Sequence, residues 1–228
     1  MKNLNIENET GRSMIEMLGV LAIIGVLSVG GIAGYSKAMQ KYRINKTIEQ
    51  FSLISGNIQS FFASQNDFTG LDILSYDGQS SDTAKSILKK AKLIPDEMWN
   101  SAGTSLENAF GGEFIIYGSK QSGSTGIYTY DKSVSLYVSG ISEEACIELF
   151  SHDWTNINGI DAVVAGGYSS GVASTLDRYS VNGSGIKDDR YYFIAYKDSI
   201  PVPVDKAVTA CAASASDDVR GFALRFKK

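Results

Sequence analysis

The stretch that decides the fold is GRSMIEMLGVLAIIGVLSVGGIAGY, residues 11–35. It is almost entirely apolar from Met14 to Ala33, apart from one carboxylate, Glu16, near its start. As a helix these roughly 20 residues would span about 30 Å, the thickness of the hydrocarbon core of a bilayer. A carboxylate inside such a span is costly unless a partner neutralises it. The stretch therefore predicts a membrane-spanning helix and raises the question of what Glu16 does there.

Composition limits the classes of function that the rest of the chain can have. The 228 residues suffice for one domain and an anchor, and the net charge of −4 gives no bulk attraction to nucleic acid. One His and two Cys nearly exclude a metal site built from these residues. Cys146 and Cys211 are either two separate buried thiols or one disulfide, and export of the domain would favour the disulfide.

The junction Gly11-Arg12-Ser13-Met14-Ile15-Glu16 joins a short polar start, MKNLNIENETG, to the apolar run. A cleaved secretory signal would have a shorter apolar core and a small-x-small cleavage site, whereas the apolar run here is longer and no A-x-A pattern closes it. A simple signal anchor is one alternative. The glycine, the glutamate five residues later and the unbroken apolar run resemble the processing site of type IV prepilins and their pseudopilin relatives.

The resemblance implies a role for each residue of the junction. A prepilin peptidase would cut after Gly11 on the cytoplasmic side, leaving Arg12 as an N-methylated N-terminus, a position where many members have Phe. In a filament, the α-amino group of Arg12 of one subunit would neutralise Glu16 of a neighbour and so report correct register.

The resemblance also implies location and partners. The precursor would cross the inner membrane once, with its globular part in the periplasm. The mature chain would then enter an extracellular, helical homo-oligomeric filament, built by the pilus assembly machinery together with other minor pilins.

Basic residues near the apolar run favour the opposite orientation. Lys37, Lys41, Arg43 and Lys46 follow the run, whereas Lys2 is the only basic residue of the segment before Gly11. The positive-inside rule would place the side after the run in the cytoplasm. We give more weight to the processing motif and expect the C-terminal part to face outward.

Glycines interrupt the apolar helix at Gly25, Gly30, Gly31 and Gly34. Each costs about 1 kcal/mol relative to Ala in a helix interior. Two compatible hypotheses account for them: close packing of neighbouring helices through small residues, or a segment soft enough to stretch or unwind in a filament.

An apolar stripe continues the helix beyond the membrane, from Tyr35 to about Ser64. It consists of Ile44, Ile48, Phe51, Ile54 or Ser55, Ile58 and Phe61 or Phe62. The sequence thus predicts one helix of about 50 residues. The whole chain would then consist of a leader (1–11), an assembly half (12–35) and an amphipathic half (36–64) of this helix, and a globular head (65–228).

Helices and strands are both expected in the head. A helix over 84–91 would follow the N-cap candidates 81–83 and stop at Pro95, and a second over 143–150 would be capped by Ser142. Strands are predicted over 113–117, 126–130, 134–138, 161–165, 191–196 and 221–226, with a hairpin turn at 131–133.

The consecutive strands predict an antiparallel sheet. The order of elements resembles type IV pilin heads, with a Cys-bounded region 146–211, and Phe110-Gly111-Gly112 and the size of the head resemble the type IVb branch. The implied fold is α+β, with a long N-terminal α-helix packed against an antiparallel β-sheet head.

Several motifs could suggest chemistry, and none assembles a catalytic site. Residues 167–171 spell G-x-S-x-G, but His152 is the sole His and precedes the serine. Residues 118–125 lack the lysine of a P-loop and are interpreted as a turn. The Asp pairs 188–189 and 217–218 could ligate Ca²⁺, although solvated loop charges are favoured. We expect no enzyme, no cofactor and no metal.

The resemblance implies a structural subunit of a type IV pilus, serving adhesion, aggregation, motility or DNA transfer. The alternatives are a pseudopilin of a type II secretion system, a minor pilin, and a membrane-anchored periplasmic binding module that does not assemble. The Cys pair favours a pilin over a pseudopilin.

Overall fold

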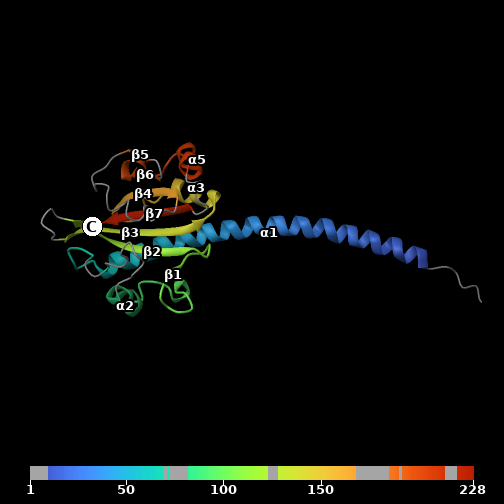
Figure 1. The fold of residues 1–228 in the computed structure, drawn as a ribbon, viewed down its shortest axis with the longest axis horizontal. Coiled ribbons are helices and arrows are strands. Elements are labelled where there is room, and N and C mark those ends of the chain that lie inside the picture. Colours follow the sequence, from blue (N-terminus) through green and yellow to red (C-terminus); the bar gives the residue numbers. More distant parts are fainter. Residues whose placement is uncertain are drawn as a thin grey trace, which may run out of the picture. The chain divides into compact units, whose positions relative to one another are not determined.

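The computed structural model describes residues 10–68, 71, 82–122, 128–167, 185–189, 192–213 and 220–228. The chain divides into an N-terminal unit, Met1–Tyr42, and a C-terminal unit, Arg43–Lys228. The helix α1, Thr10–Phe61, supplies residues to both units and is 52 residues long (Figure 1). The single long N-terminal helix expected from the sequence is therefore confirmed.

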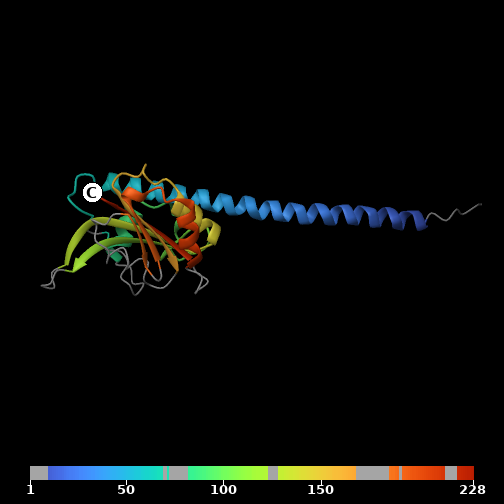
Figure 2. The same ribbon diagram turned by 90° about the horizontal axis from the view of Figure 1, so that it is seen from above.

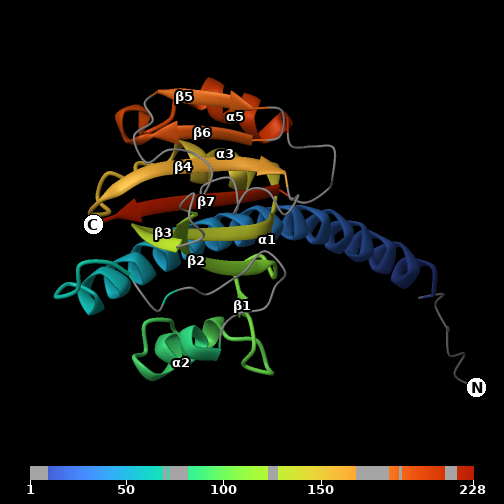
Figure 3. The same cartoon turned by 60° about the vertical axis from the view of Figure 1, so that its left-hand side comes forward.

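The described part of the C-terminal unit contains a seven-stranded sheet, in the order β1-β2-β3-β7-β4-β6-β5 (Figure 3). Its strands are β1 (Leu106–Glu107), β2 (Glu113–Ser122), β3 (Tyr128–Ile141), β4 (Ile160–Gly167), β5 (Ile186–Asp189), β6 (Tyr192–Tyr196) and β7 (Arg220–Lys227). Each pairing between these strands is antiparallel. The predicted α+β class, a long N-terminal helix with an antiparallel sheet, is confirmed.

The C-terminal half of α1 lies along one face of the sheet (Figure 2). Ile44, Ile54 and Ile58 are completely buried, and the Phe51 ring lies within 5.4–5.5 Å of the rings of Phe114, Trp154 and Phe222. The predicted apolar stripe is thus the spine of the core. Phe62 rather than Phe61 completes it, because Phe61 remains 47% exposed.

Shorter helices surround the sheet. They are α2 (Asp82–Lys90), the 3-10 turn η1 (Asp96–Met98), α3 (Glu143–Ser151), the 3-10 turn η2 (Lys197–Ser199) and α5 (Val204–Ala213). The expected capping of α3 is present, since the Ser142 hydroxyl accepts a hydrogen bond from Ala145 N at 3.2 Å. The sequence did not predict α5 or the strands β1 and β5.

The predicted hairpin turn at 131–133 is wrong, as is the division of this region into two strands. Residues 128–141 form one strand, β3. The partner strand β2 runs on to Ser122, which lies opposite Tyr128, and residues 131–133 lie in an irregularity of this ladder, between the pairs Gly118–Val134 and Lys120–Tyr130. Gly118–Ser122 also belongs to β2 and is not the turn expected there.

A tight turn joins β1 to β2 at the Phe110-Gly111-Gly112 segment. Asn108 Nδ2 donates to Ser139 O at 2.8 Å, and Asn108 Oδ1 accepts from Phe110 N at 2.8 Å. A Cβ on Gly112 would lie 2.1 Å from Ser139 O, so only glycine allows β3 to approach this closely. The Asn108 side chain and Gly112 together fix the position of the turn against β3.

The opposite face of the sheet holds a buried ion pair that the sequence did not reveal. Arg225, on β7, is 1% exposed, and its Nε and a terminal nitrogen lie 2.7 and 2.5 Å from Asp161 Oδ2. Lys227 Nζ lies 3.2 Å from the other oxygen of Asp161. A second buried cluster, formed by Tyr137, Ala162, Val164, Ile194, Tyr196 and Ala223, lies on this face.

Candidate functional site

The N-terminal part of α1 exposes nearly every large apolar side chain that it carries. Residues 14–38 are all exposed, and Val26, for example, is 75% exposed. The exposed residues are Met14, Ile15, Met17, Leu18, Val20, Leu21, Ile23, Ile24, Val26, Leu27, Val29 and Ile32. Water-soluble monomers do not present so large a contiguous apolar surface. By length and composition, α1 is long and apolar enough to cross a membrane.

The junction residues lie at the start of this helix. Gly11 and Arg12 are in the first turn of α1, and Glu16 is exposed on the next turn. The structure thus places Glu16 on the surface that a bilayer or a neighbouring helix would cover. It does not test the expected cleavage, methylation or subunit pairing, which remain predictions.

The glycines of the apolar segment are not required by the fold of the single chain. A Cβ built on Gly25, Gly30, Gly31 or Gly34 would meet nothing within 4 Å, and α1 is helical throughout this region. Alanine would stabilise such a helix by about 1 kcal/mol per position. The fold of the single chain therefore gives no reason for glycine at these positions, and both hypotheses about helix packing and softness stay predictions.

A disulfide joins Cys146 on α3 to Cys211 on α5, with the two Cα atoms 5.9 Å apart. Both residues are completely buried. The structure decides between the two alternatives left by the sequence in favour of the disulfide. It links α3 with the helix before the last strand and closes the region 146–211.

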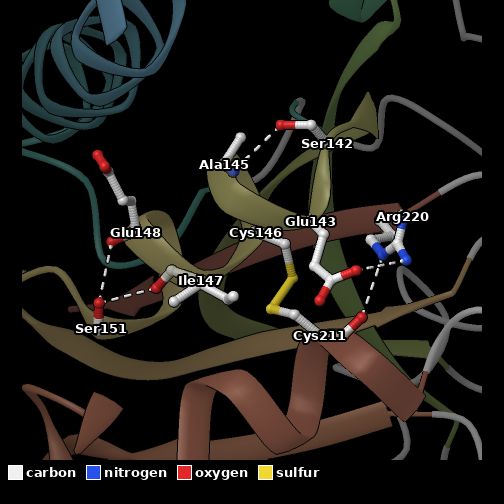
Figure 4. The surroundings of a disulfide bond; sticks show 9 residues. All are labelled: Ser142, Glu143, Ala145, Cys146, Ile147, Glu148, Ser151, Cys211 and Arg220. Carbon is white, nitrogen blue, oxygen red and sulfur yellow. Dashed lines mark hydrogen bonds and ion pairs between the residues drawn. A yellow bond between two sulfur atoms is a disulfide. The ribbon is translucent and has the colours of Figure 1, made fainter. Parts of the chain in front are cut away.

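Arg220 at the start of β7 adds a polar contact beside the disulfide (Figure 4). Its Nε donates to Cys211 O at 3.1 Å, and a terminal nitrogen lies 3.1 Å from Glu143 Oε2. One guanidinium therefore contacts both helices that the sulfur atoms connect. The sequence pattern gave no signal for this residue, since a single Arg after a polar segment is common.

The single histidine of the chain ends α3 and packs on a tryptophan. The rings of His152 and Trp154 lie 4.6 Å apart, and Trp154 Nε1 donates to Leu149 O. Burial lowers the pKa of His152 below its ordinary value, and the nearby Asp153 carboxylate partly opposes this. Hydrogen bonds from Thr155 lower the pKa of Asp153. His152 therefore belongs to the packing around the core.

The described residues give little support to the sequence motifs that could indicate catalysis or metal binding. Gly167 ends β4, and the rest of the G-x-S-x-G motif, like Asp217-Asp218, lies outside the described ranges. Asp188 and Asp189 belong to the strand β5 and not to a loop as expected. Within the described ranges, no group of three or more His, Cys, Asp or Glu is placed to hold a metal ion.

Comparison with known proteins finds similarity to subunits of a pilus. No family model matches the chain. The chain is 24% identical over 148 residues to the major structural subunit of bundle-forming pilus of Escherichia coli O127:H6 (strain E2348/69 / EPEC). It matches the subunit of the same description from Escherichia coli O111:H- equally well. The matched stretch covers 65% of this chain and 67% of each relative, which makes the chain a distant homologue of these subunits.

Proposed function

We propose that this chain is a structural subunit of a type IV pilus and not an enzyme. The observation that carries the proposal is the exposed apolar segment of α1, which begins three residues after Gly11 and contains one carboxylate, Glu16, five residues after that glycine. The distant similarity to pilus major subunits supports the same conclusion. Adhesion, aggregation, motility and DNA transfer are the activities that such a fibre would serve.

The apolar segment would have two successive environments. As a precursor, the chain would be held in the inner membrane by residues 12–35, with residues 65–228 in the periplasm. Removal of the leader 1–11 by a prepilin peptidase would leave Arg12, which the same enzyme would N-methylate. The assembly machinery would then transfer the segment from lipid into the core of a helical homo-oligomer, alongside minor pilins, on the cell surface.

Glu16 would set the register of this transfer. A carboxylate in a bundle of apolar helices needs a cationic partner, and the new α-amino group of Arg12 of a neighbouring subunit would provide it. A subunit in the wrong register would bury Glu16 without that partner. Correct assembly is therefore favoured, because every incorrect alignment leaves a buried carboxylate without a cationic partner.

The mass of the mature N-terminus tests the processing step. The proposal expects a chain that begins at N-methylated Arg12. An intact Met1, or a chain cleaved at another position, would refute the proposed processing.

A substitution at Glu16 tests assembly. Glu16→Gln should abolish fibres seen by electron microscopy while the protein remains in the membrane fraction. Glu49→Gln makes the same change on the same helix, where the carboxylate is 70% exposed and lies 3.9 Å from Lys46 Nζ. This control should assemble normally, and fibres of Glu16→Gln as abundant as those of the control would contradict the role of Glu16.

The alternatives make different predictions. A membrane-anchored binding module would function unchanged with Glu16→Gln. A minor pilin would leave fibres present when this chain is deleted, and a pseudopilin of a type II secretion system would leave surface fibres intact but stop secretion of other proteins.

A further inference from the structure

We propose that Tyr35, Lys37, Lys41 and Tyr42 form a lipid-binding collar that holds anionic phospholipid headgroups around the precursor. The collar lies on α1, within the N-terminal unit, and follows the apolar segment directly. The inference rests on the membrane-anchored precursor of the proposed function. It assigns to these residues a partner, an anionic headgroup, that neither the fold nor the pilus similarity supplies.

Length places the collar at the level of the headgroups. The apolar run from Met14 to Gly34 spans about 31 Å at 1.5 Å per residue, which fills the hydrocarbon core. Tyr35 then lies at its boundary, and Lys37 and Lys41 lie within two further turns, about 10 Å. Lysine side chains near helix ends extend toward the interface, and tyrosine is enriched at that depth.

The residues surround the helix instead of forming one stripe. Tyr35 and Tyr42 are seven residues apart and share a face, whereas Lys37 and Lys41 are four apart and lie on the opposite side. Tyr35 and Tyr42 are 67% and 59% exposed, and both lysines are exposed as well. Headgroups can therefore reach the lysines on one side while the tyrosine rings rest at the interface on the other.

The collar also accounts for Lys37 and Lys41, two of the four basic residues whose position opposes the proposed orientation. By the positive-inside rule, basic residues after the span favour the cytoplasmic side and so oppose the proposed outward orientation. Binding to phosphate groups gives them a different role, because basic side chains near an anionic surface attract it electrostatically. The same two lysines would delay the departure of a subunit from the bilayer until assembly offers a competing environment.

Lipid selectivity of the full chain tests the assignment. We would reconstitute the protein in vesicles. Electron spin resonance would then measure how strongly the protein restricts the motion of spin-labelled phosphatidylglycerol relative to spin-labelled phosphatidylcholine. The wild-type chain should prefer the anionic lipid severalfold at low ionic strength, with about fivefold per lysine as the upper limit. The preference should shrink as salt is added, because exposed charges are screened.

Variants identify the residues responsible. Lys37→Gln/Lys41→Gln should bring the two lipids close to equality, whereas Lys37→Arg/Lys41→Arg should retain the preference. Lys90→Gln/Lys206→Gln removes two exposed lysines of α2 and α5 and should change nothing. Resistance to carbonate extraction verifies that each variant is inserted.

Three results would overturn the assignment. They are equal restriction of both lipids by the wild type, a preference that is insensitive to salt, and a preference that survives Lys37→Gln/Lys41→Gln. Lysines paired with carboxylates of a second copy would produce the first of these. The N-terminal mass and the Glu16→Gln fibres report on processing and polymerisation, so failure of the pilus proposal is distinguishable from failure of the collar.

Discussion

Removing the carboxylate of Asp161 should destabilise the C-terminal unit more than any exposed charge substitution. Asp161 contacts two nitrogens of Arg225, which is 1% exposed, at 2.7 and 2.5 Å. Asp161→Asn would leave that guanidinium buried and facing a neutral amide. Breaking a buried pair from one side costs about 3–5 kcal/mol, because the remaining charge stays desolvated.

The opposite substitution should cost less, and the structure gives the reason. With Arg225→Met, the carboxylate of Asp161 keeps Lys227 Nζ at 3.2 Å, and this lysine is 40% exposed. Methionine also refills part of the volume left by the arginine. We expect about 1–3 kcal/mol, and the double variant Asp161→Asn/Arg225→Met should be more stable than the sum of the two single losses implies.

Urea unfolding of the full chain in a mild detergent, followed by tryptophan fluorescence, measures these differences. Trp154 is completely buried in the core and reports on the C-terminal unit. Glu143→Gln is the matched control, because it removes a 50% exposed carboxylate from Arg220 and should cost at most about 1 kcal/mol. An Asp161→Asn variant that is as stable as Glu143→Gln would refute the reasoning.

Two further predictions concern the disulfide and the histidine. Cys146→Ala/Cys211→Ala should lower the free energy of unfolding by about 4 kcal/mol, from the loop that the bond closes, with strand and helix content retained in circular dichroism. His152 has a lowered pKa in the folded state, so its neutral form is favoured by folding, and the resulting stability is present above its unfolded pKa of about 6.5 and lost as pH falls. His152→Gln should therefore flatten the loss of thermal stability between about pH 7.5 and 5, and an unchanged pH dependence would contradict the assignment.

The sequence predicted best where one physical signal acts alone. The apolar run and the stripe through Phe51 and Ile58 follow helical periodicity over many turns, so the long helix and its buried face were predictable. Strands β4, β6 and β7 were predicted for a similar reason, since apolar and β-branched residues gather there. The helix α3 was predicted because Ser142 supplies a cap.

The failures share a cause, which is partnership between distant residues. Asp131-Lys132-Ser133 has the composition of a turn, yet it lies within β3 as an irregularity, because the pairing of β3 with β2 resumes beyond it and Ser133 is paired with Lys227 of β7. Asp161 and Arg225 are 64 positions apart, and only the pairing of β4 with β7 brings them together. The pattern of residue types along the sequence carries no information about which distant strands pair.

The residues of the candidate site also fall into local motifs and contacts between distant residues. The junction Gly11 to Glu16 is a local motif that the sequence alone displays, and its cleavage, methylation and pairing stay predictions. The contact of Arg220 with Glu143 and Cys211 could not, because it depends on how β7 approaches the two helices.

The place of β7 in the sheet has a consequence for biogenesis. The strand that comes last in sequence lies between β3 and β4, and the two halves of the sheet, β1-β2-β3 and β4-β6-β5, are joined through it. Without residues 220–227, each half keeps an unpaired edge, and Leu224, Phe222 and Phe226 are missing from the core. A chain that lacks β7 would thus remain an open, protease-sensitive species, so that the closed sheet is available only once this strand has been made and inserted.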